Sequence, residues 1–472
     1  PLFRKLNLYT AYEFLETRFD KKTRTFTSFL FLLSRGLSTG ISIVAPSLVI
    51  SSILGWDIYW TNVVMGGLLI IYTVSGGARA VAYTQQLQFI IIFLGMALAG
   101  YYAVKLLPAG IGFKEAMDTA GDAGRMNIIT TGINKEGQYN WNDRFNIISG
   151  IIGGFFLAWS YFGTDQSQVG RYLTAKSVRE SRMGLIMNGL VKVPMQFFIL
   201  LTGVLVFAYY NYQPGPVNFN RQVTQKVEQS VYKNEAQTIN AAYQETKKEL
   251  SQLLVEQQNT ATPEAKARMT GLYRNADSLR KAYQTLASKA GAGNADDTNY
   301  IFFAFITSHL PAGIVGLLIA MIFMASWGSI AAALNSLASS SMVDFHKQYS
   351  RKTLTEEQEY TTSKWYTFAW GMFCILAAQF ATSLGSLIVA VNVLGSLFYG
   401  TILGIFMVAF YLKKVKGHAV FFSAVIAELF VCYVYFILHF DGFLWLNVIG
   451  ALIVFILSPI AQSVIERVEE GR

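Results

Sequence analysis

Residues 312–336 read AGIVGLLIAMIFMASWGSIAAALNS, a run without a single charged side chain. A helix needs roughly 20 apolar residues to cross the hydrocarbon core of a bilayer. Similar runs recur along the chain, in which 53% of the residues are hydrophobic and only 14% are charged. Soluble domains carry about 25% charged residues. The pattern therefore predicts an all-α polytopic membrane protein.

Ten stretches are apolar enough to be transmembrane spans, and they are 25–54, 57–76, 84–106, 146–170, 184–211, 312–344, 363–385, 387–412, 418–439 and 443–463. If these spans alternate in direction, the clusters of Lys and Arg at 18–24, 171–182 and 413–416 fall on one side. The positive-inside rule places that side in the cytoplasm. The net charge of +9 is then a feature of topology, and we expect no nucleic-acid partner.

Residues 213–299 differ from the rest because they are polar and rich in Gln, Lys, Glu and Ala. The pattern predicts two helices, 225–258 and 264–289, joined by a turn at 259–263. We therefore expect a first transmembrane part at 1–212, an extracytoplasmic helical hairpin at 213–299, here called the insert, and a second transmembrane part at 300–472. The insert is either a passive spacer, or a lid or docking surface for an unknown partner.

The fourth span becomes polar near Gly163, Thr164 and Asp165. A glycine beside polar residues weakens a helix and frees backbone groups, which membrane proteins tolerate only where these groups line a cavity or are buried in protein. A charge inside a span is a functional candidate. Asp165 either serves the solute site or pairs with Arg171 or a helix N-terminus. Lys192 in the fifth span either snorkels to the interface or contacts solute.

The sixth span contains small residues and hydroxyls around Ala325 and Ser329, which are four residues apart and share a helix face. Oxygen atoms there suit a hard cation, although close helix packing through small residues explains the same pattern. Asn392 precedes another glycine-loosened stretch. Other polar residues within spans, Arg35 and Glu428 among them, have no role assigned by sequence. Cys374 and Cys432 lie in apolar spans, so neither zinc, an iron–sulfur cluster nor a disulfide is expected.

Four stretches carry a resemblance to a known family. They are LYTAYEFLETRF at 8–19, SGGARAVAYTQQLQ at 75–88, GTDQSQVGRYL at 163–173 followed by AKS at 175–177, and the segment from Asn335 to Asp344. In this order they resemble the sodium/solute symporters, which include bacterial sugar, proline and sialic-acid transporters. The resemblance implies a LeuT-type inverted-repeat fold. It also implies that the chain is an N-terminally truncated fragment, with about ten transmembrane helices present and the first core helices missing.

The resemblance assigns roles to individual residues. It implies sodium ligation by the Ala325 carbonyl and the Ser329 hydroxyl, with Ser326 and Gly328 adjacent, and Gly328 stands where many members have a second hydroxyl. Candidate solute-binding residues are Tyr161 at an aromatic inner gate, Asp165, Gln166, Lys192 and Asn392. Two-sodium members have an Asp where this chain has Gln85. We therefore expect the second sodium site to be absent and one Na⁺ to be the coupling ion.

These features predict a sodium-coupled symporter of a small polar solute, such as a sugar, sialic acid, amino acid or carboxylate. We expect it to work by alternating access in the lipid bilayer of a bacterial inner membrane. The alternative is a membrane solute sensor built on the same fold. An enzyme is not expected, because the chain has no metal cluster, nucleophile elbow or phosphate-binding loop.

Overall fold

The computed structural model describes residues 8–127, 129–134, 136–173, 177–257, 262–350, 354–382 and 385–470, and the side chains of 76–88, 173 and 469–470 are outside that description. Within these ranges the chain is helical, and its one β-bridge joins Ile133 and Tyr139. The helices are α2 (Glu13–Arg18), α3 (Lys21–Leu54), α4 (Ile58–Lys105), α5 (Phe113–Asp122), α6 (Ile147–Thr164), α7 (Gln166–Leu173), α8 (Val178–Tyr212), α9 (Arg221–Glu228), α10 (Lys233–Glu256), α11 (Pro263–Lys289), α12 (Ile301–His309), α13 (Ala312–Ser340), the π-helix η1 (Ser341–His346), α14 (Lys347–Tyr349), α15 (Glu356–Ala381), α16 (Leu387–Tyr411), α17 (Gly417–Phe436) and α18 (Leu444–Glu470).

The helix ends follow from local sequence. Asp20 caps α3 by accepting a hydrogen bond from the Thr23 amide at 2.8 Å. Gly55 ends the same helix with φ +70°, a left-handed conformation that glycine adopts without steric cost. Asp57 then caps α4, so α3 and α4 are joined by a tight connection. At the insert, Thr262 caps α11 and Pro263 occupies its first turn, where a missing amide proton costs nothing.

Eight helical stretches among the described residues are long and apolar enough to cross a membrane. The other two predicted spans correspond to the shorter apolar stretch Phe89–Lys105 of α4 and to α15. One boundary differs from the prediction, because α4 is assigned as one helix where two spans were expected. Its halves nevertheless have different neighbours. Gly66 packs against Ile375 of α15, whereas Gly95 packs against Leu318 of α13.

The main core lies between α3, α15, α16, α17 and α18, and its fully buried side chains include Phe31, Phe406 and Val431. Helices α16 and α18 approach closely because glycines face the contact. A Cβ atom on Gly400 would lie 2.6 Å from the Asn447 carbonyl oxygen, and one on Gly404 would lie 2.7 Å from Val454 Cβ. Small residues at such contacts are typical of membrane helix packing.

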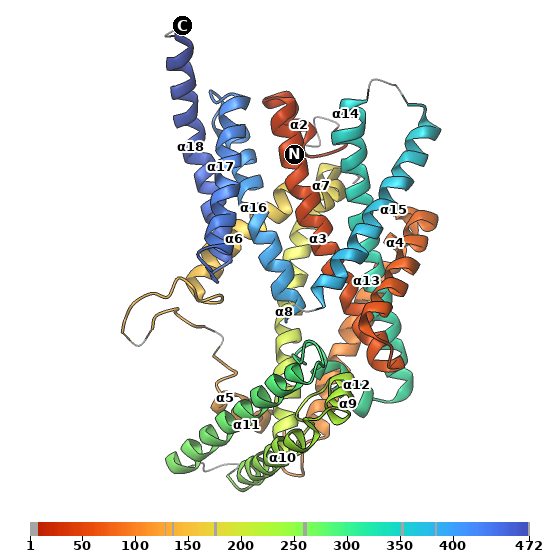
Figure 1. Ribbon diagram of the computed structural model, residues 1–472, viewed down its shortest axis with the longest axis vertical. Helices are drawn as coiled ribbons and strands as arrows, with labels where there is room; N and C mark the ends of the chain where they lie inside the picture. The colour runs from red at the N-terminus through yellow and green to blue at the C-terminus, as the bar shows by residue number, and fades with distance from the viewer. Residues whose placement is uncertain are drawn as a thin grey trace.

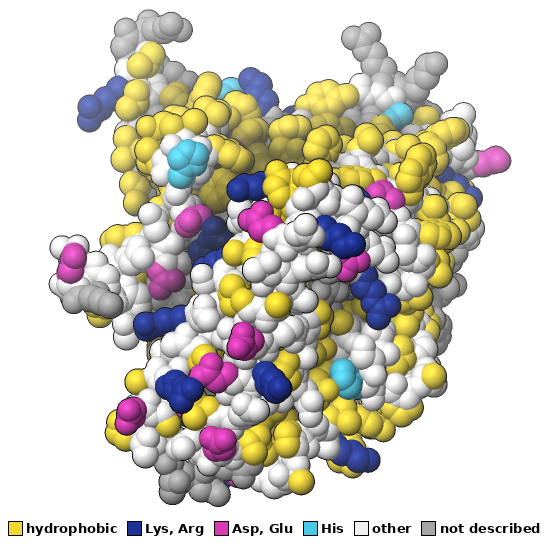
Figure 2. Space-filling model, turned by 60° about the horizontal axis from the view of Figure 1, so that its bottom comes forward, with side chains coloured by type: hydrophobic (Ala, Val, Ile, Leu, Met, Phe, Trp, Pro, Cys, Tyr) yellow, Lys and Arg dark blue, Asp and Glu magenta, His cyan; other side chains and the backbone are white. Residues whose placement is uncertain are grey.

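The insert lies at the end of the bundle opposite the C-terminus (Figure 1). It contains three helices, α9, α10 and α11, where two were predicted, because α10 begins at Lys233 and the short α9 precedes it. The insert has its own core, which includes Val227, Tyr243 and Tyr283. Charges of both signs are scattered over this end of the molecule between hydrophobic side chains (Figure 2).

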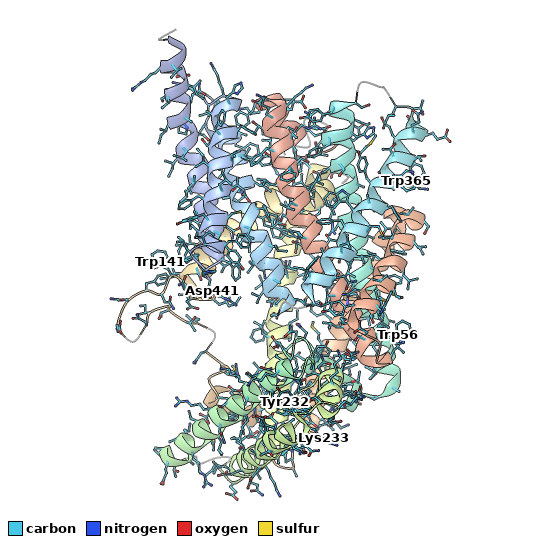
Figure 3. All side chains as sticks on the ribbon, viewed as in Figure 1. Trp56, Trp141, Tyr232, Lys233, Trp365 and Asp441 are labelled. Carbon is cyan, nitrogen blue, oxygen red and sulfur yellow. The ribbon has the colours of Figure 1, made fainter. Side chains whose placement is uncertain are left out.

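Exposed tryptophans occur toward both ends of the bundle. Trp56 and Trp141 lie toward the insert, and Trp365 lies toward the other end (Figure 3). Tryptophan is enriched at the two membrane–water interfaces, where its ring is amphipathic. The placement of these side chains therefore agrees with membrane–water interfaces near both ends of the bundle.

Candidate functional site

The predicted break in the fourth span is confirmed at Asp165. Helix α6 ends at Thr164, Asp165 has the extended conformation φ −73°, ψ 120°, and α7 begins at Gln166. The side chain of Asp165 caps the new helix, because Oδ1 accepts hydrogen bonds from the Ser167 amide at 2.8 Å and the Ser167 hydroxyl at 2.5 Å. A carboxylate is favoured there because the amide protons at a helix start are otherwise unpaired.

A second partner secures Asp165 from across the bundle. The hydroxyl of Tyr399 on α16 donates to Asp165 Oδ2 at 2.8 Å, and the Tyr399 carbonyl accepts from Ser160 Oγ at 2.7 Å. Asp165 is 1% exposed and Tyr399 is 6% exposed. The break and the last turn of α6 before it are therefore both attached to α16. Sequence reasoning missed Tyr399, because its only local signal is a tyrosine in a glycine-rich apolar helix.

A cavity of about 390 Å³ lies next to this break, between α3, α6, α8 and α16. Three predicted site residues, Tyr161, Lys192 and Asn392, line it together with Arg35 and Tyr399. The Lys192 side chain is exposed, and its Nζ lies 5.8 Å from the centre of the Phe162 ring. The structure thus brings together side chains from four helices that are far apart in sequence.

Arg35 lines the cavity although it was not among the predicted site residues. Its guanidinium interacts electrostatically with Asp165, Tyr399 and Tyr161, yet its Nε atom is buried without a hydrogen-bond partner among the described residues. A buried donor left unpaired costs about 1–3 kcal/mol. An arginine inside the apolar run 25–54 was a signal for this role, but its partners were not visible in sequence.

Two predicted solute residues do not line the cavity. Asp165 lies behind Tyr399. Gln166 is 4% exposed and binds the segment before α2, since its Oε1 accepts from the Ala11 amide at 2.8 Å and its Nε2 donates to the Tyr9 carbonyl at 3.0 Å. Gln166 therefore fixes the start of α7 to the N-terminal segment of the described chain.

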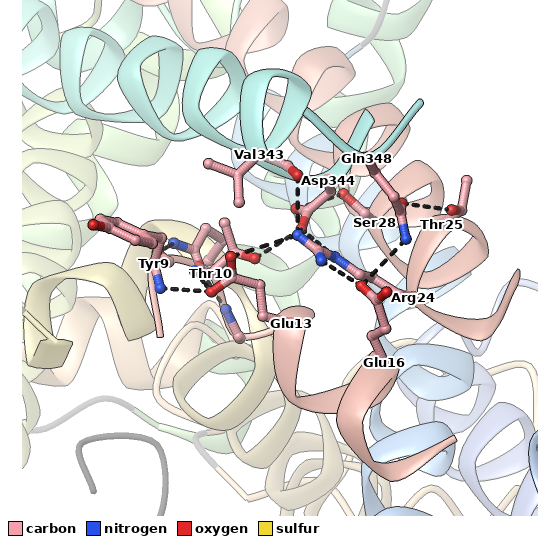
Figure 4. A network of polar contacts seen from close by, with 12 residues as sticks. Tyr9, Thr10, Glu13, Glu16, Arg24, Thr25, Ser28, Val343, Asp344 and Gln348 are labelled. Atoms are coloured by element: carbon pink, nitrogen blue, oxygen red, sulfur yellow. Dashed lines mark hydrogen bonds and ion pairs between the residues drawn. The ribbon is translucent and has the colours of Figure 1, made fainter. Parts of the chain in front are cut away.

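The same N-terminal segment enters a buried polar network with Asp344 of η1 (Figure 4). Arg24 of α3 donates from Nε at 2.9 Å and from a terminal nitrogen at 2.7 Å to Asp344 Oδ1. Thr10 Oγ1 donates to the same oxygen at 2.8 Å, and Ser28 Oγ donates to Oδ2 at 3.0 Å. Residues 9–12 thus connect the broken helix with α3 and the end of α13.

The predicted sodium residues all lie on α13. Ala325 and Ser326 are half-buried, Gly328 is buried and Ser329 is exposed. Ser336, further along the same helix, donates a hydrogen bond from its hydroxyl to the Ala332 carbonyl at 3.0 Å. No equivalent bond ties the Ser329 hydroxyl to Ala325 among the described contacts, so this hydroxyl is available to a cation, whereas the Ala325 carbonyl lies within the continuous helix α13. Gln85 falls where side chains are not described, and the absence of a second sodium site stays a prediction.

Comparisons with known proteins agree with this arrangement. The model of the sodium:solute symporter family matches residues 1–237 and 278–427. The sodium/sialic acid symporter SiaT of Proteus mirabilis (strain HI4320) is 25% identical over 421 residues, which cover 88% of this chain and 68% of that protein. The human sodium-coupled monocarboxylate transporter 1 is 32% identical over 194 residues, covering 40% of this chain and 29% of that protein.

The fold is also found in a solved structure, that of a Na⁺-coupled sialic acid symporter in a substrate-bound outward-open state. The two superimpose with a TM-score of 0.71 at 24% identity, over 98% of this chain and 79% of that one. This match confirms the expected LeuT-type fold, and the family match accounts for Na⁺ as the coupling ion. The protein therefore belongs to the sodium:solute symporter family.

Proposed function

We propose that this protein is a sodium-coupled symporter whose solute is a small organic anion with a carboxylate group, bound in the cavity between α3, α6, α8 and α16. The observation that carries the proposal is the charge of the cavity. Arg35 and Lys192 line it, and none of its described lining residues is acidic. Asp165, which lies behind Tyr399, offsets part of the Arg35 charge, but no carboxylate of the described lining faces Lys192, so the cavity keeps a net positive charge that favours a negatively charged ligand.

Each side chain has a distinct part in binding. Arg35 donates to the carboxylate from its unpaired Nε, and a guanidinium can hold both carboxylate oxygens at once. Lys192 adds a positive charge on a flexible side chain from α8. Asn392 donates one hydrogen to the Ile388 carbonyl at 2.9 Å and keeps its amide oxygen and second hydrogen for solute hydroxyl or amide groups. Tyr161 accepts from Gln168 Nε2 at 2.7 Å and keeps its own proton to donate.

One sodium ion binds at α13 through the Ala325 carbonyl and the Ser329 hydroxyl, with Ser326 adjacent. Oxygen atoms are the ligands that hard cations prefer. The broken helix α6–α7 and its attachment to residues 9–12 through Gln166 then supply the element that rocks between the two access states. The membrane is a bacterial inner membrane, with the insert on its outer face.

The charges predict how transport is driven. One Na⁺ with a monovalent anion moves no net charge, so a membrane potential does not contribute and a tenfold sodium gradient supplies about 1.4 kcal/mol, enough for about tenfold accumulation. A neutral solute would gain about 2.3 kcal/mol more from 100 mV. Electroneutral uptake is therefore the expected signature of one sodium ion and one carboxylate.

The test is radiolabelled uptake into proteoliposomes of sialic acid, lactate, glucose and proline, with a sodium gradient and with or without a potassium diffusion potential. Sodium-driven uptake of sialic acid or lactate that the potential leaves unchanged supports the proposal. Uptake of glucose alone, or uptake strongly stimulated by a negative interior, refutes the assignment of solute or stoichiometry. Solute binding without any uptake would indicate a sensor.

Two variants separate the sites. Ser329→Ala should raise the sodium concentration needed for half-maximal uptake by about tenfold or more, because the cation loses one of its coordinating oxygen atoms. Ser336→Ala is the matched control, since that hydroxyl is already bonded to its own helix. Lys192→Gln should instead raise the KM for the anion and leave the sodium dependence unchanged.

A further inference from the structure

A second cavity, of about 320 Å³, lies where the end of α8 meets the insert and α12. The helices that form it gather at the insert end of the molecule (Figure 1). Its described lining shares no residue with the cavity beside the broken helix. Any ligand that it holds would therefore occupy a site separate from that of the transported solute.

Aromatic and cationic side chains dominate the lining of this second cavity. Its rings come from Phe207, Tyr210, Phe219, Tyr243, Tyr273 and Phe302. Its cations are Arg125, Lys247 and Arg280, and Asp277 is the one acidic residue in the described lining. A pocket of rings with a few placed charges is suited to an organic ligand that has an apolar body and a charged group.

The two arginines already have partners. Arg125 lies 4.0 Å from Asp277 and stacks over the Phe207 ring at 5.2 Å. Arg280 binds the buried Asp297 carboxylate at 2.5 Å. Carboxylates and aromatic faces therefore position both guanidinium groups in the wall of the cavity, where they add positive potential.

Lys247 and Tyr273 have hydrogen-bonding capacity left over. Lys247 is 6% exposed, and its Nζ donates to Asn211 Oδ1 at 2.5 Å. An ammonium group has three donors, so two remain. The hydroxyl of Tyr273 is buried without a hydrogen-bond partner among the described residues. Lys247 and Tyr273 line one cavity whose only carboxylate in the described lining, Asp277, is shared with Arg125. Buried donors with unused capacity are costly unless a ligand completes them.

These two residues lie where the family model does not match. That model leaves out residues 238–277, which include both Lys247 and Tyr273. The cavity wall thus combines helices that the family model matches, such as α8, with a segment that the model leaves out. The capacity to bind a ligand here belongs to the insert of this protein.

We propose that this second cavity is a regulatory binding site for a small soluble organic carboxylate with an apolar body, held by Lys247 and Tyr273. The carboxylate accepts hydrogen bonds from the Lys247 ammonium and the Tyr273 hydroxyl, and the aromatic rings enclose the apolar body. Since α8 also contributes Lys192 to the first cavity, occupancy at one end of α8 restrains the helix that lines the transport site.

The test is calorimetric titration of the purified protein in detergent with benzoate, and with benzyl alcohol and benzylammonium as uncharged and cationic probes of the same shape. Saturable benzoate binding that weakens about tenfold or more in Lys247→Gln, and severalfold in Tyr273→Phe, supports the proposal. Lys248→Gln is the matched control, because Lys248 follows Lys247 on α10 and its side chain is exposed. Tyr273→Phe removes only one hydroxyl, so it still tests the site if the lysine variant does not fold.

Four outcomes would overturn the proposal. The first is no saturable binding of benzoate in the millimolar range, and the second is equally tight binding of the two probes that lack a carboxylate. Loss of binding in Lys192→Gln with no change in Lys247→Gln would place benzoate in the transport cavity. Abolition of benzoate binding in nanodiscs that contain phosphatidylglycerol, but not in phosphatidylcholine discs, would assign the cavity to a lipid headgroup.

Discussion

Replacing Arg24 should destabilise the protein more than replacing its buried partner Asp344, although both residues form the same ion pair. Asp344 is fully buried and accepts hydrogen bonds from Arg24, Thr10 and Ser28. In Arg24→Gln the carboxylate keeps only its two hydroxyl donors. Removing one member of a buried pair in this way costs about 3–5 kcal/mol.

Asp344→Asn should be milder because Arg24 has other carboxylates. Its guanidinium lies 2.6 Å from Glu16 and 3.6 Å from Glu13. The loss is then that of charged hydrogen bonds, about 1.5–3 kcal/mol. The double variant should cost less than the sum of the single changes, since either change alone already breaks the pair.

The assay is thermal unfolding of the purified protein in detergent, followed by intrinsic fluorescence. For a chain of this size each kcal/mol corresponds to roughly 1–2 °C, extrapolated from smaller domains. We expect the apparent Tm to fall by roughly 3–10 °C in Arg24→Gln. Asp441→Asn is the matched control, because its ion pair with Arg144 is about half exposed and should contribute little. Equal losses for Arg24→Gln and Asp344→Asn, or strict additivity in the double variant, would refute this reasoning.

Three further predictions follow from single contacts. Burial and the neighbouring Arg280 lower the pKa of Lys247 to about 7. The pKa of a lysine in an unfolded chain is about 10.4. Between pH 7 and this value the unfolded chain therefore binds more protons than the folded protein. The free energy of unfolding should rise with pH across that window by up to about 1.4 kcal/mol per pH unit. Lys247→Met should flatten this rise in thermal scans at successive pH values. Gly400→Ala should cost about 1–3 kcal/mol, because its Cβ would meet the Asn447 carbonyl, whereas Gly313→Ala in open space should be neutral in the same scans. Tyr399→Phe should lower the rate of solute uptake more than it lowers Tm, because it releases one side of the helix break; a parallel fall of both would indicate a purely structural bond.

The amino-acid sequence determined the features that depend on local chemistry. Transfer of apolar side chains into a bilayer is favourable residue by residue, so hydropathy alone located the membrane spans. The helix break could be predicted because Gly163, Thr164 and Asp165 weaken a helix wherever they occur together. The polar composition of residues 213–299 likewise set the insert apart, although the extra helix α9 was not foreseen.

Only the tertiary structure decided which polar side chains meet. Gln166 was predicted to contact solute, but it binds backbone atoms of Tyr9 and Ala11 far away in the chain. Arg35 had no assigned role until α3, α6, α8 and α16 enclosed a cavity around it. The pairing of Lys247 with Asn211 was equally invisible. Hydrogen bonds and ion pairs depend on distances of about 3 Å between atoms, and such distances between remote residues are set by how whole helices pack.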